Sequence, residues 1–107
     1  DLTQNYTCGR IFTAPSCSHP LGNSAQGVCD LAGNVWEWVA DDYHRNYENA
    51  PNDGSPWCDE PQCGGDDGIR VWRGGDMLSD VSRLRASSRG SYGQGVQFYW
   101  MGFRLAR

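Results

Sequence analysis

Residues 30–44 read DLAGNVWEWVADDYH and place tryptophans at positions 36 and 38, on either side of Glu37. The β-branched and aromatic run VWEWVA at 35–40 predicts a short strand. Because successive strand residues point to opposite faces, Glu37 should point away from the face that Trp36 and Trp38 share, with one indole ring in the core. Glu37 is therefore either a solvated or arginine-paired surface acid, or an acid held in place to bind something.

An ion is one interpretation of this stretch. Asp30 and Glu37 would supply carboxylates, and Gly33 and Val35 would supply backbone carbonyls. Hard oxygen ligands around a tight glycine turn suit Ca²⁺, which takes six to eight oxygens. The spacing is not that of an EF-hand, so the pattern by itself leaves calcium beside the solvated or arginine-paired alternative.

The rest of the chain predicts one loop-rich domain. Its 107 residues include 14 glycines and five prolines, a composition typical of many turns. Strand-sized segments occur at 69–75, 83–89 and 101–107, and no segment has the 3.6-residue period of an amphipathic helix. The acidic, Pro- and Gly-rich segment 41–68 should be a long surface excursion. We expect an antiparallel, disulfide-braced domain.

The charge pattern excludes some partners. The net charge is −4 and all nine cations are arginines, without a basic run, which argues against nucleic acid and anionic membranes. No apolar stretch approaches the roughly 20 residues of a membrane span. The sequence begins at Asp1 without an initiator methionine, so we expect a mature product or a fragment.

The cysteines predict an oxidising, extracytoplasmic environment. There are five, and their spacing lacks the paired CxxC motifs of a zinc ribbon. We expect two disulfides, Cys17–Cys29 across a Pro/Gly turn region and Cys58–Cys63 closing the acidic excursion. Cys8 should be unpaired or bonded outside this chain. Asn5 begins a glycosylation sequon, which matters only where the source has that machinery.

The segment SYGQGVQFYW at 91–100 is a candidate ligand-binding loop. Aromatic and amide side chains on a loop of a rigid scaffold are typical of binding surfaces. The alternative is that Phe98 and Trp100 complete the core. No GxSxG, HExxH or phosphate-loop motif occurs, so no catalytic residue is assigned. The candidate ligand-binding residues are Tyr92, Gln94, Gln97, Phe98, Tyr99 and Trp100.

Three arginines lie inside apolar strand-like segments. We expect Arg73, Arg85 and Arg104 to be largely buried and paired to carboxylates or backbone carbonyls, because an unpaired buried guanidinium is costly.

The stretches GNSAQGVCDLAGNVWEWVADDY, RVWRGG, LRASSRG and MGFRLAR occur in this order and span nearly the whole chain. They resemble the C-terminal half of the formylglycine-generating enzyme (sulfatase-modifying factor) family domain. The resemblance implies a C-type-lectin-like α+β fold with short antiparallel strands and little helix. It also implies that residues 1–107 are one half of a domain, whose partner is a missing N-terminal half or another chain.

The resemblance bears on the calcium interpretation and on catalysis. The family's enzymes carry a calcium whose ligand pattern falls on Asp30, Gly33, Val35 and Glu37. The oxidase also uses a C-x4-C pair just after R-G-G-S, where this chain has Asp76 and no cysteine beyond Cys63. Copper-dependent oxidation of a sulfatase cysteine is therefore not expected.

Three functions remain open from the sequence. The first is a non-catalytic, calcium-stabilised, extracytoplasmic binding or structural domain, with a protein or small ligand at the 91–100 loop. The second is a superfamily enzyme with different chemistry, whose catalytic residues lie on the missing half. The third is a ligand-binding protein of the retroelement-diversified C-type-lectin-like kind.

Overall fold

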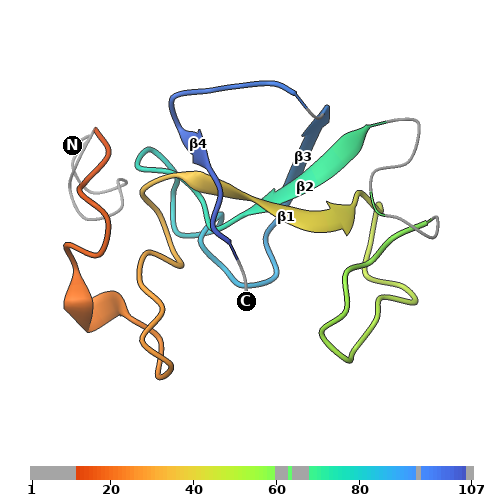
Figure 1. Ribbon diagram of the computed structural model, residues 1–107, viewed down its shortest axis with the longest axis horizontal. Coiled ribbons are helices and arrows are strands. Elements are labelled where there is room, and N and C mark those ends of the chain that lie inside the picture. The colour runs from red at the N-terminus through yellow and green to blue at the C-terminus, as the bar shows by residue number, and fades with distance from the viewer. Residues whose placement is uncertain (1–11, 60–62, 64–67, 94, 106–107) are drawn as a thin grey trace.

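A computed structural model describes residues 12–59, 63, 68–93 and 95–105. One four-stranded sheet in the order β3-β2-β1-β4 forms its centre (Figure 1). The strands are β1 (Trp36–Asp42), β2 (Ile69–Arg73), β3 (Gly90–Gly93) and β4 (Met101–Gly102). The only helix among the described residues is a 3-10 turn, η3 (Pro20–Gly22). The regular secondary structure of the described residues is thus almost all strand. Of the expected α+β, C-type-lectin-like fold, the loop-rich chain, the short strands and the scarcity of helix are confirmed.

The tryptophan-flanked stretch forms the strand that the sequence predicts. β1 pairs antiparallel with β2, with Glu37 opposite Arg73 and Trp38 opposite Trp72. The register then shifts before Asp42 pairs with Arg70, which marks a β-bulge. A bulge bends its strand and increases the local twist. β1 therefore curves as it leads into the acidic excursion.

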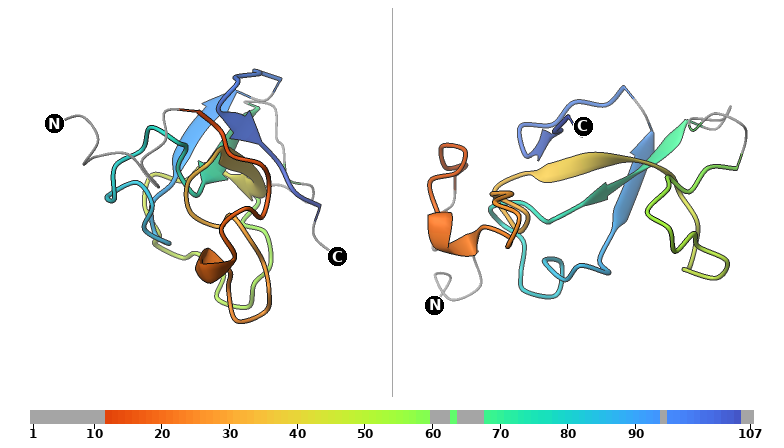
Figure 2. Two further views of the ribbon diagram at one scale, coloured as in Figure 1. Left: turned by 90° about the vertical axis from the view of Figure 1, so that its left-hand side faces the viewer. Right: turned by 60° about the horizontal axis from the view of Figure 1, so that its bottom comes forward.

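The C-terminal pairing differs from the antiparallel expectation. β4 runs parallel to β1, with Trp36 opposite Met101 and Glu37 opposite Gly102. Both views in Figure 2 show β4 beside β1 at one edge of the sheet. A parallel neighbour needs a crossover connection, and the segment after β3 supplies it. This pairing brings the C-terminal arginine segment next to Glu37.

The predicted strand at 83–89 is wrong. Residues 80–87 form consecutive turns, and the next strand, β3, begins at Gly90. Asp80 explains the turns because its Oδ1 accepts hydrogen bonds from the backbone N–H of Ser82 and from the Ser82 hydroxyl. Such side-chain bonds to nearby backbone compete with strand pairing. The predicted strand at 101–107 is also shorter, since β4 ends at Gly102.

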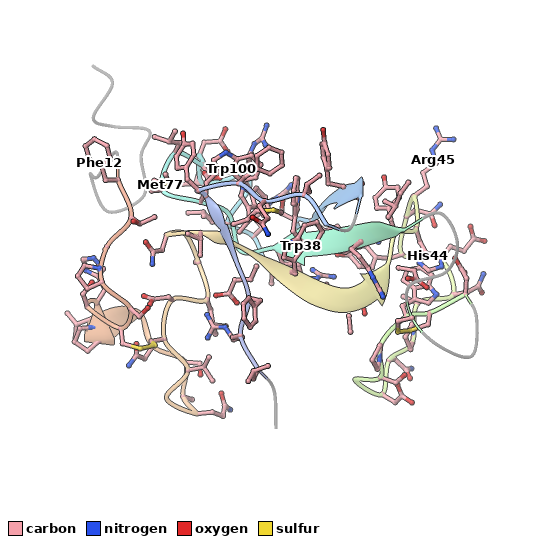
Figure 3. All side chains as sticks on the ribbon, turned by 45° about the horizontal axis from the view of Figure 1, so that its top comes forward. Phe12, Trp38, His44, Arg45, Met77 and Trp100 are labelled. Carbon is pink, nitrogen blue, oxygen red and sulfur yellow. A yellow bond between two sulfur atoms is a disulfide. The ribbon has the colours of Figure 1, made fainter. Side chains whose placement is uncertain are left out.

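Trp72 is the centre of an aromatic cluster on the sheet. Its ring centroid lies 5.9 Å from that of Trp36, 5.6 Å from that of Trp38 and 5.5 Å from that of Trp100. Trp36 is 6% exposed, as expected for the tryptophan that anchors β1. Trp38 and Trp100 lie over the sheet in Figure 3. The fully buried core is small, because only Trp36, Val71 and Met77 are buried hydrophobics among the described residues.

The acidic excursion is fastened to the sheet by polar and aromatic contacts. Trp57 donates its backbone N–H to Asp41 Oδ1, and its carbonyl accepts the N–H of Asp42. The His44 ring stacks on Trp57 with centroids 3.7 Å apart. The Arg89 guanidinium lies 4.3 Å from the centroid of the Tyr47 ring. In Figure 1 this excursion and the N-terminal segment extend from opposite ends of the sheet.

Within the described residues, no helix has the length and apolar character that crossing a membrane requires.

Candidate functional site: an aromatic and charged groove beside an arginine-bound turn

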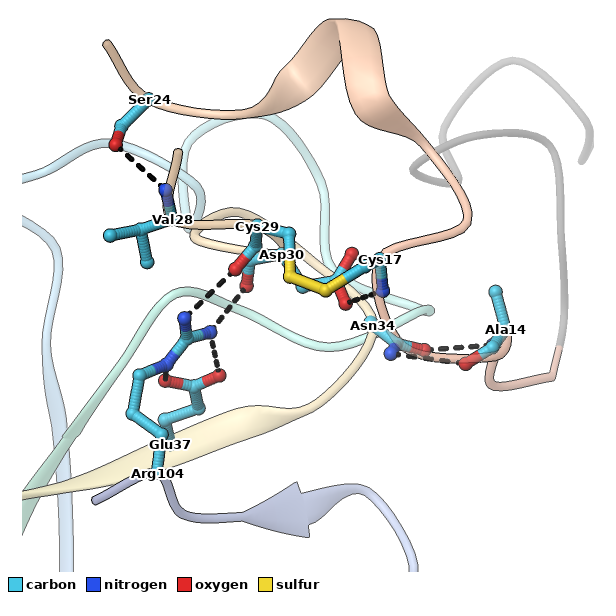
Figure 4. The surroundings of a disulfide bond; sticks show 9 residues. All are labelled: Ala14, Cys17, Ser24, Val28, Cys29, Asp30, Asn34, Glu37 and Arg104. Carbon is cyan, nitrogen blue, oxygen red and sulfur yellow. Dashed lines mark hydrogen bonds and ion pairs between the residues drawn. A yellow bond between two sulfur atoms is a disulfide. The ribbon is translucent and has the colours of Figure 1, made fainter. Parts of the chain in front are cut away.

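The turn before β1 is built from residues with unusual backbone angles. Asp30, Gly33 and Asn34 have φ values of 54°, 82° and 71°. The Asn34 side chain holds the turn against the N-terminal segment, since its amide donates to the carbonyl of Ala14 and its oxygen accepts the Ala14 N–H. Asp30 Oδ2 accepts the backbone N–H of Cys17 (Figure 4). The turn is therefore fixed by side-chain bonds rather than by regular structure.

Arg104 crosses from the C-terminal segment and fills this turn. Its guanidinium makes a two-pronged ion pair with the Glu37 carboxylate, one bond of which joins Nε to Oε2 at 2.6 Å (Figure 4). The same guanidinium donates to the carbonyls of Cys29 and Asp30 at 2.9 and 3.2 Å. These bonds from Glu37 and its negative charge raise the pKa of Arg104, and partial burial acts in the opposite sense. Glu37 is thus arginine-paired, not turned to solvent.

The oxygens that bind Arg104 are of the kind that a hard cation takes, but only the Glu37 carboxylate among them belongs to the predicted calcium set, because Cys29 and Asp30 contribute backbone carbonyls here. A carboxylate and two backbone carbonyls already bind the guanidinium, and oxygens of this kind are what Ca²⁺ takes. Each carboxylate oxygen has lone pairs beyond the one that Arg104 uses. Of the predicted ligands, Gly33 is buried and its carbonyl accepts the N–H of Val35. Asp30, Glu37 and the carbonyls of Gly33 and Val35 would be the residues to hold the ion.

Two disulfides form between the cysteines that the sequence pairs. Cys17 bonds Cys29 and braces the N-terminal segment beside the Arg104 turn (Figure 4). Cys58 bonds Cys63 within the acidic excursion. Cys8 and the sequon at Asn5 lie outside the described residues. The Cys17–Cys29 link places the Cys29 carbonyl where Arg104 binds it, so the disulfide supports the turn as well as the segment.

The arginine expectation is right for pairing and wrong for burial. Arg73 is half-buried and donates to the Ala86 carbonyl and to the Tyr47 hydroxyl. Arg85 is exposed and donates only to the Ser82 carbonyl among the described residues. The Arg104 side chain is 36% exposed. Because the sheet is small, these side chains lie at its rim, where water can solvate the guanidinium N–H groups that have no protein partner.

A groove with an aromatic floor lies on the sheet next to this turn. One pocket of about 510 Å³ is lined by Trp36, Asp76, Leu78, Ser79, Asp80 and Arg83. A second, of about 490 Å³, is lined by Trp36, Trp72, Asp76, Arg83, Ser88, Arg89, Gly90, Ser91 and Trp100. The pockets share Trp36, Asp76 and Arg83, so they adjoin at these residues. We call the two pockets together the aromatic groove.

The wall of the aromatic groove is the segment that follows Arg73-Gly74-Gly75. Asp76 organises it, because Oδ1 accepts the Leu78 N–H and the Ser79 hydroxyl, the latter at 2.7 Å. Gly75 has a φ of 75°, and a Cβ there would lie 2.6 Å from Leu84 Cδ2, so no other residue fits this turn without a shift. The segment therefore presents Asp76, Asp80 and Arg83 along the groove.

The 91–100 loop contributes to the groove less than the sequence suggests. Trp100 lines the groove, and Phe98 stacks on it with ring centroids 4.4 Å apart. Tyr92 contacts both Trp72 and Phe98, yet is half exposed. Gln97 is exposed, Tyr99 is 76% exposed and Gln94 lies outside the described residues. Phe98 and Trp100 thus serve both alternatives, since they pack on the core cluster and border a pocket.

The sequence-based site missed most of the groove. Trp72 comes from β2, whereas Ser79, Asp80, Arg83 and Arg89 come from the segment between β2 and β3, and no motif joins them. A signal was present in the turns, because Asp-x-x-Ser at 76–79 and Asp-x-Ser at 80–82 are typical of side-chain-capped turns. Those patterns predict a fixed loop, and a fixed loop on a rigid sheet is a common place for a binding site.

The sheet, the Arg-Gly-Gly turn and the groove together define a loop-rich, disulfide-braced domain built around a small twisted sheet. The chain belongs to the sulfatase-modifying factor enzyme 1-like domain family, whose model matches residues 2–107.

Two relatives give the comparison more detail. The chain is 36% identical over 102 residues to the formylglycine-generating enzyme of Streptomyces coelicolor, covering 92% of this chain and 30% of that protein. It is similar to the solved structure of PvdO from Pseudomonas aeruginosa, with a TM-score of 0.74 and 38% identity. That match covers 89% of this chain and 34% of PvdO. The chain thus spans about a third of the length of either relative.

Proposed function

We propose that this chain is part of a non-catalytic, extracytoplasmic binding domain of the formylglycine-generating-enzyme-like superfamily, and that the aromatic groove is its binding site. One observation carries the proposal. The segment after Arg73-Gly74-Gly75, where the oxidase has its cysteine pair, here lines the groove with Asp76, Ser79, Asp80 and Arg83. Those side chains recognise polar groups, but they do not offer the thiol chemistry of the oxidase. The two disulfides support an oxidising compartment.

The proposal also includes a partner for this chain, namely the rest of the family domain. A third pocket of about 670 Å³ lies near the Arg104 turn, with apolar side chains from Leu31, Trp38, Val39, Leu84 and Leu105. Phe103 and Leu105 are 75% and 88% exposed. Exposed apolar side chains that border an apolar pocket are typical of an interaction site. We assign this face to the portion of the family domain that the chain does not span, since it spans only about a third of its relatives.

A different enzyme chemistry is the second candidate. The Ser79 hydroxyl donates to Asp76 inside the groove, a hydroxyl–carboxylate pair that a catalytic site could use. Ser79 is 5% exposed, however, and Asp76 already accepts two hydrogen bonds through Oδ1. The Asp76–Ser79 pair therefore stabilises the turn, and we favour binding over catalysis.

The absence of oxidase activity is directly testable. Native protein incubated with copper, oxygen and a cysteine-containing sulfatase peptide should leave the peptide mass unchanged. The Streptomyces coelicolor formylglycine-generating enzyme, run in parallel, is the positive control. Conversion of the peptide cysteine to formylglycine by this protein would contradict the non-catalytic assignment, whatever the groove binds.

Calcium at the Arg104 turn is a further part of the proposal. When bound, the ion would link Asp30 to Glu37 and so stiffen the entry to β1. Calcium at about a hundredfold excess over its Kd should stabilise the native protein by roughly 2.7 kcal/mol, because it binds the folded state only. Thermal unfolding with calcium and with a chelator measures this. Glu37→Gln should abolish the gain, and Glu48→Gln, which changes an exposed acid of the excursion, should keep it.

Arg104→Met distinguishes whether the Arg104 guanidinium and Ca²⁺ share Glu37 or compete for it. If the guanidinium and the ion share Glu37, the variant should bind calcium with unchanged or weaker affinity. If they compete, the variant should gain calcium stabilisation that the native protein lacks. An unchanged melting temperature on chelation, in the native protein and in Arg104→Met, would show that the turn takes no calcium.

A further inference from the structure

The two arginines that line the aromatic groove differ in how many hydrogen bonds their guanidinium groups make within the protein. Arg89 donates to the Asn46 carbonyl at 2.9 Å and stacks on Tyr47, so its guanidinium is engaged. Arg83 lines both pockets, yet its guanidinium has no hydrogen bond to any of the residues that the structure describes. A guanidinium presents paired donors whose geometry matches a carboxylate. Arg83 is therefore the group in the groove that is placed to receive an anionic oxygen pair.

Two acidic side chains flank this arginine. Asp76 lines both pockets and Asp80 lines the first. The pKa of the Asp80 carboxyl is lowered mainly by the Ser82 hydroxyl bond and also by the Arg83 charge, so it is ionised at neutral pH. Like charges close together repel at an interface. A ligand with only negative charge would meet Asp76 and Asp80 as it approached Arg83, whereas one that also carries an ammonium group would satisfy both signs.

The floor of the groove adds an apolar component. Trp36 lines both pockets, and Trp72 and Trp100 line the second, their rings in edge-to-face contact at 5.5 Å. Large, rigid rings offer contact area at a low cost in side-chain entropy. They also attract an ammonium group that lies over a ring face. The floor thus suits an apolar or aromatic body attached to the charged groups.

From these three features we infer that the aromatic groove binds an amino-acid-like zwitterion with an apolar or aromatic side chain, its carboxylate on Arg83, its ammonium group towards Asp76 and Asp80, and its side chain on the tryptophans. This inference rests on the proposed function, because it names the ligand class of the same groove. The carboxylate contact with Arg83 is the step that carries most of the specificity, since it is two-pronged and the other contacts are less directional.

A matched set of probes tests the ligand class by calorimetry and tryptophan fluorescence. L-phenylalanine has both charges, N-acetyl-L-phenylalanine keeps only the carboxylate, and L-phenylalaninamide keeps only the ammonium group. The native, full-length protein should bind L-phenylalanine at least about tenfold more tightly than either derivative, since each lacks one charged contact. Equal binding of all three, or binding of none, would overturn the inference.

Two arginine variants locate the carboxylate contact. Arg83→Gln should weaken L-phenylalanine binding at least about tenfold and leave L-phenylalaninamide unchanged, because only the carboxylate contact is removed. Arg45→Gln is the control, since Arg45 is exposed and points away from the sheet near the start of the excursion (Figure 3). Equal losses in both variants, or none in Arg83→Gln, would overturn the assignment. The oxidase assay is independent of these results, so failure of the ligand class and failure of the non-catalytic function are told apart.

Discussion

Gly90→Ala is expected to destabilise the protein by about 3 kcal/mol or to prevent folding, the upper end of what overpacking costs. Gly90 is the register partner of Trp72 on β2. A Cβ at this position would lie 1.6 Å from Trp72 Nε1 and 2.5 Å from its Cδ1. The indole is rigid and contacts three other tryptophans, so it cannot move without disturbing the cluster.

Gly93→Ala provides the matched control on the same strand. A Cβ at Gly93 would meet no atom within 4 Å, and this position does not need a left-handed backbone. Chemical unfolding of the two variants should show a midpoint loss for Gly90→Ala that is several times larger than any change for Gly93→Ala. Equal midpoints would mean that Trp72 does not lie over Gly90 and would contradict its place in the floor of the groove.

Arg70→Met is expected to cost about 3–5 kcal/mol, because it removes one member of a buried ion pair. Asp42 is 6% exposed, and its Oδ1 accepts a hydrogen bond from Arg70 Nη1 at 3.1 Å. Its Oδ2 accepts the N–H of Asp59, so this carboxylate also holds the acidic excursion. Arg70 further donates to the Ala40 carbonyl at the β1 bulge. Loss of the arginine removes this ion pair from a buried carboxylate.

Unfolding of Arg70→Met measures this cost, and two companion variants interpret it. Arg45→Met changes an exposed arginine and should shift stability by less than about 0.5 kcal/mol. The double variant Arg70→Met with Asp42→Leu should recover part of the loss, since the buried charge is gone. A loss in Arg70→Met no larger than that in Arg45→Met would show that the pair is solvated and that the excursion is held by other contacts.

Local patterns predicted the parts of the fold that depend on local physics. β1 and β2 follow from β-prone residues between turn residues, and both disulfides follow from cysteine spacing. The failure at 83–89 has the same origin, because Arg-Leu-Arg alternates like a strand while Asp80 bonds the backbone into turns. Alternation gives only a preference, and the Asp80 side chain occupies backbone N–H groups that strand pairing would need.

The candidate sites depended on contacts far apart in the sequence, which local patterns do not contain. Glu37 and Arg104 are 67 residues apart, and the parallel pairing of β1 with β4 brings them together. The sequence left open whether Glu37 was arginine-paired, and this pairing answers it. The aromatic groove is equally non-local, because its floor joins β1, β2 and the end of the 91–100 loop. Only the tertiary arrangement shows that Arg83 and three tryptophans line one pocket.

The most direct test of the groove as the functional site is a titration of the indole N–H resonances of the native protein with L-phenylalanine. Of the five tryptophans, Trp36, Trp72 and Trp100 line the groove, Trp57 stacks on His44 in the excursion, and Trp38 lines the pocket near the Arg104 turn. We expect the three groove resonances to shift together with one Kd while the Trp57 resonance stays in place. Shifts confined to Trp57, or saturation with no change at Trp36, Trp72 and Trp100, would contradict the groove as the binding site.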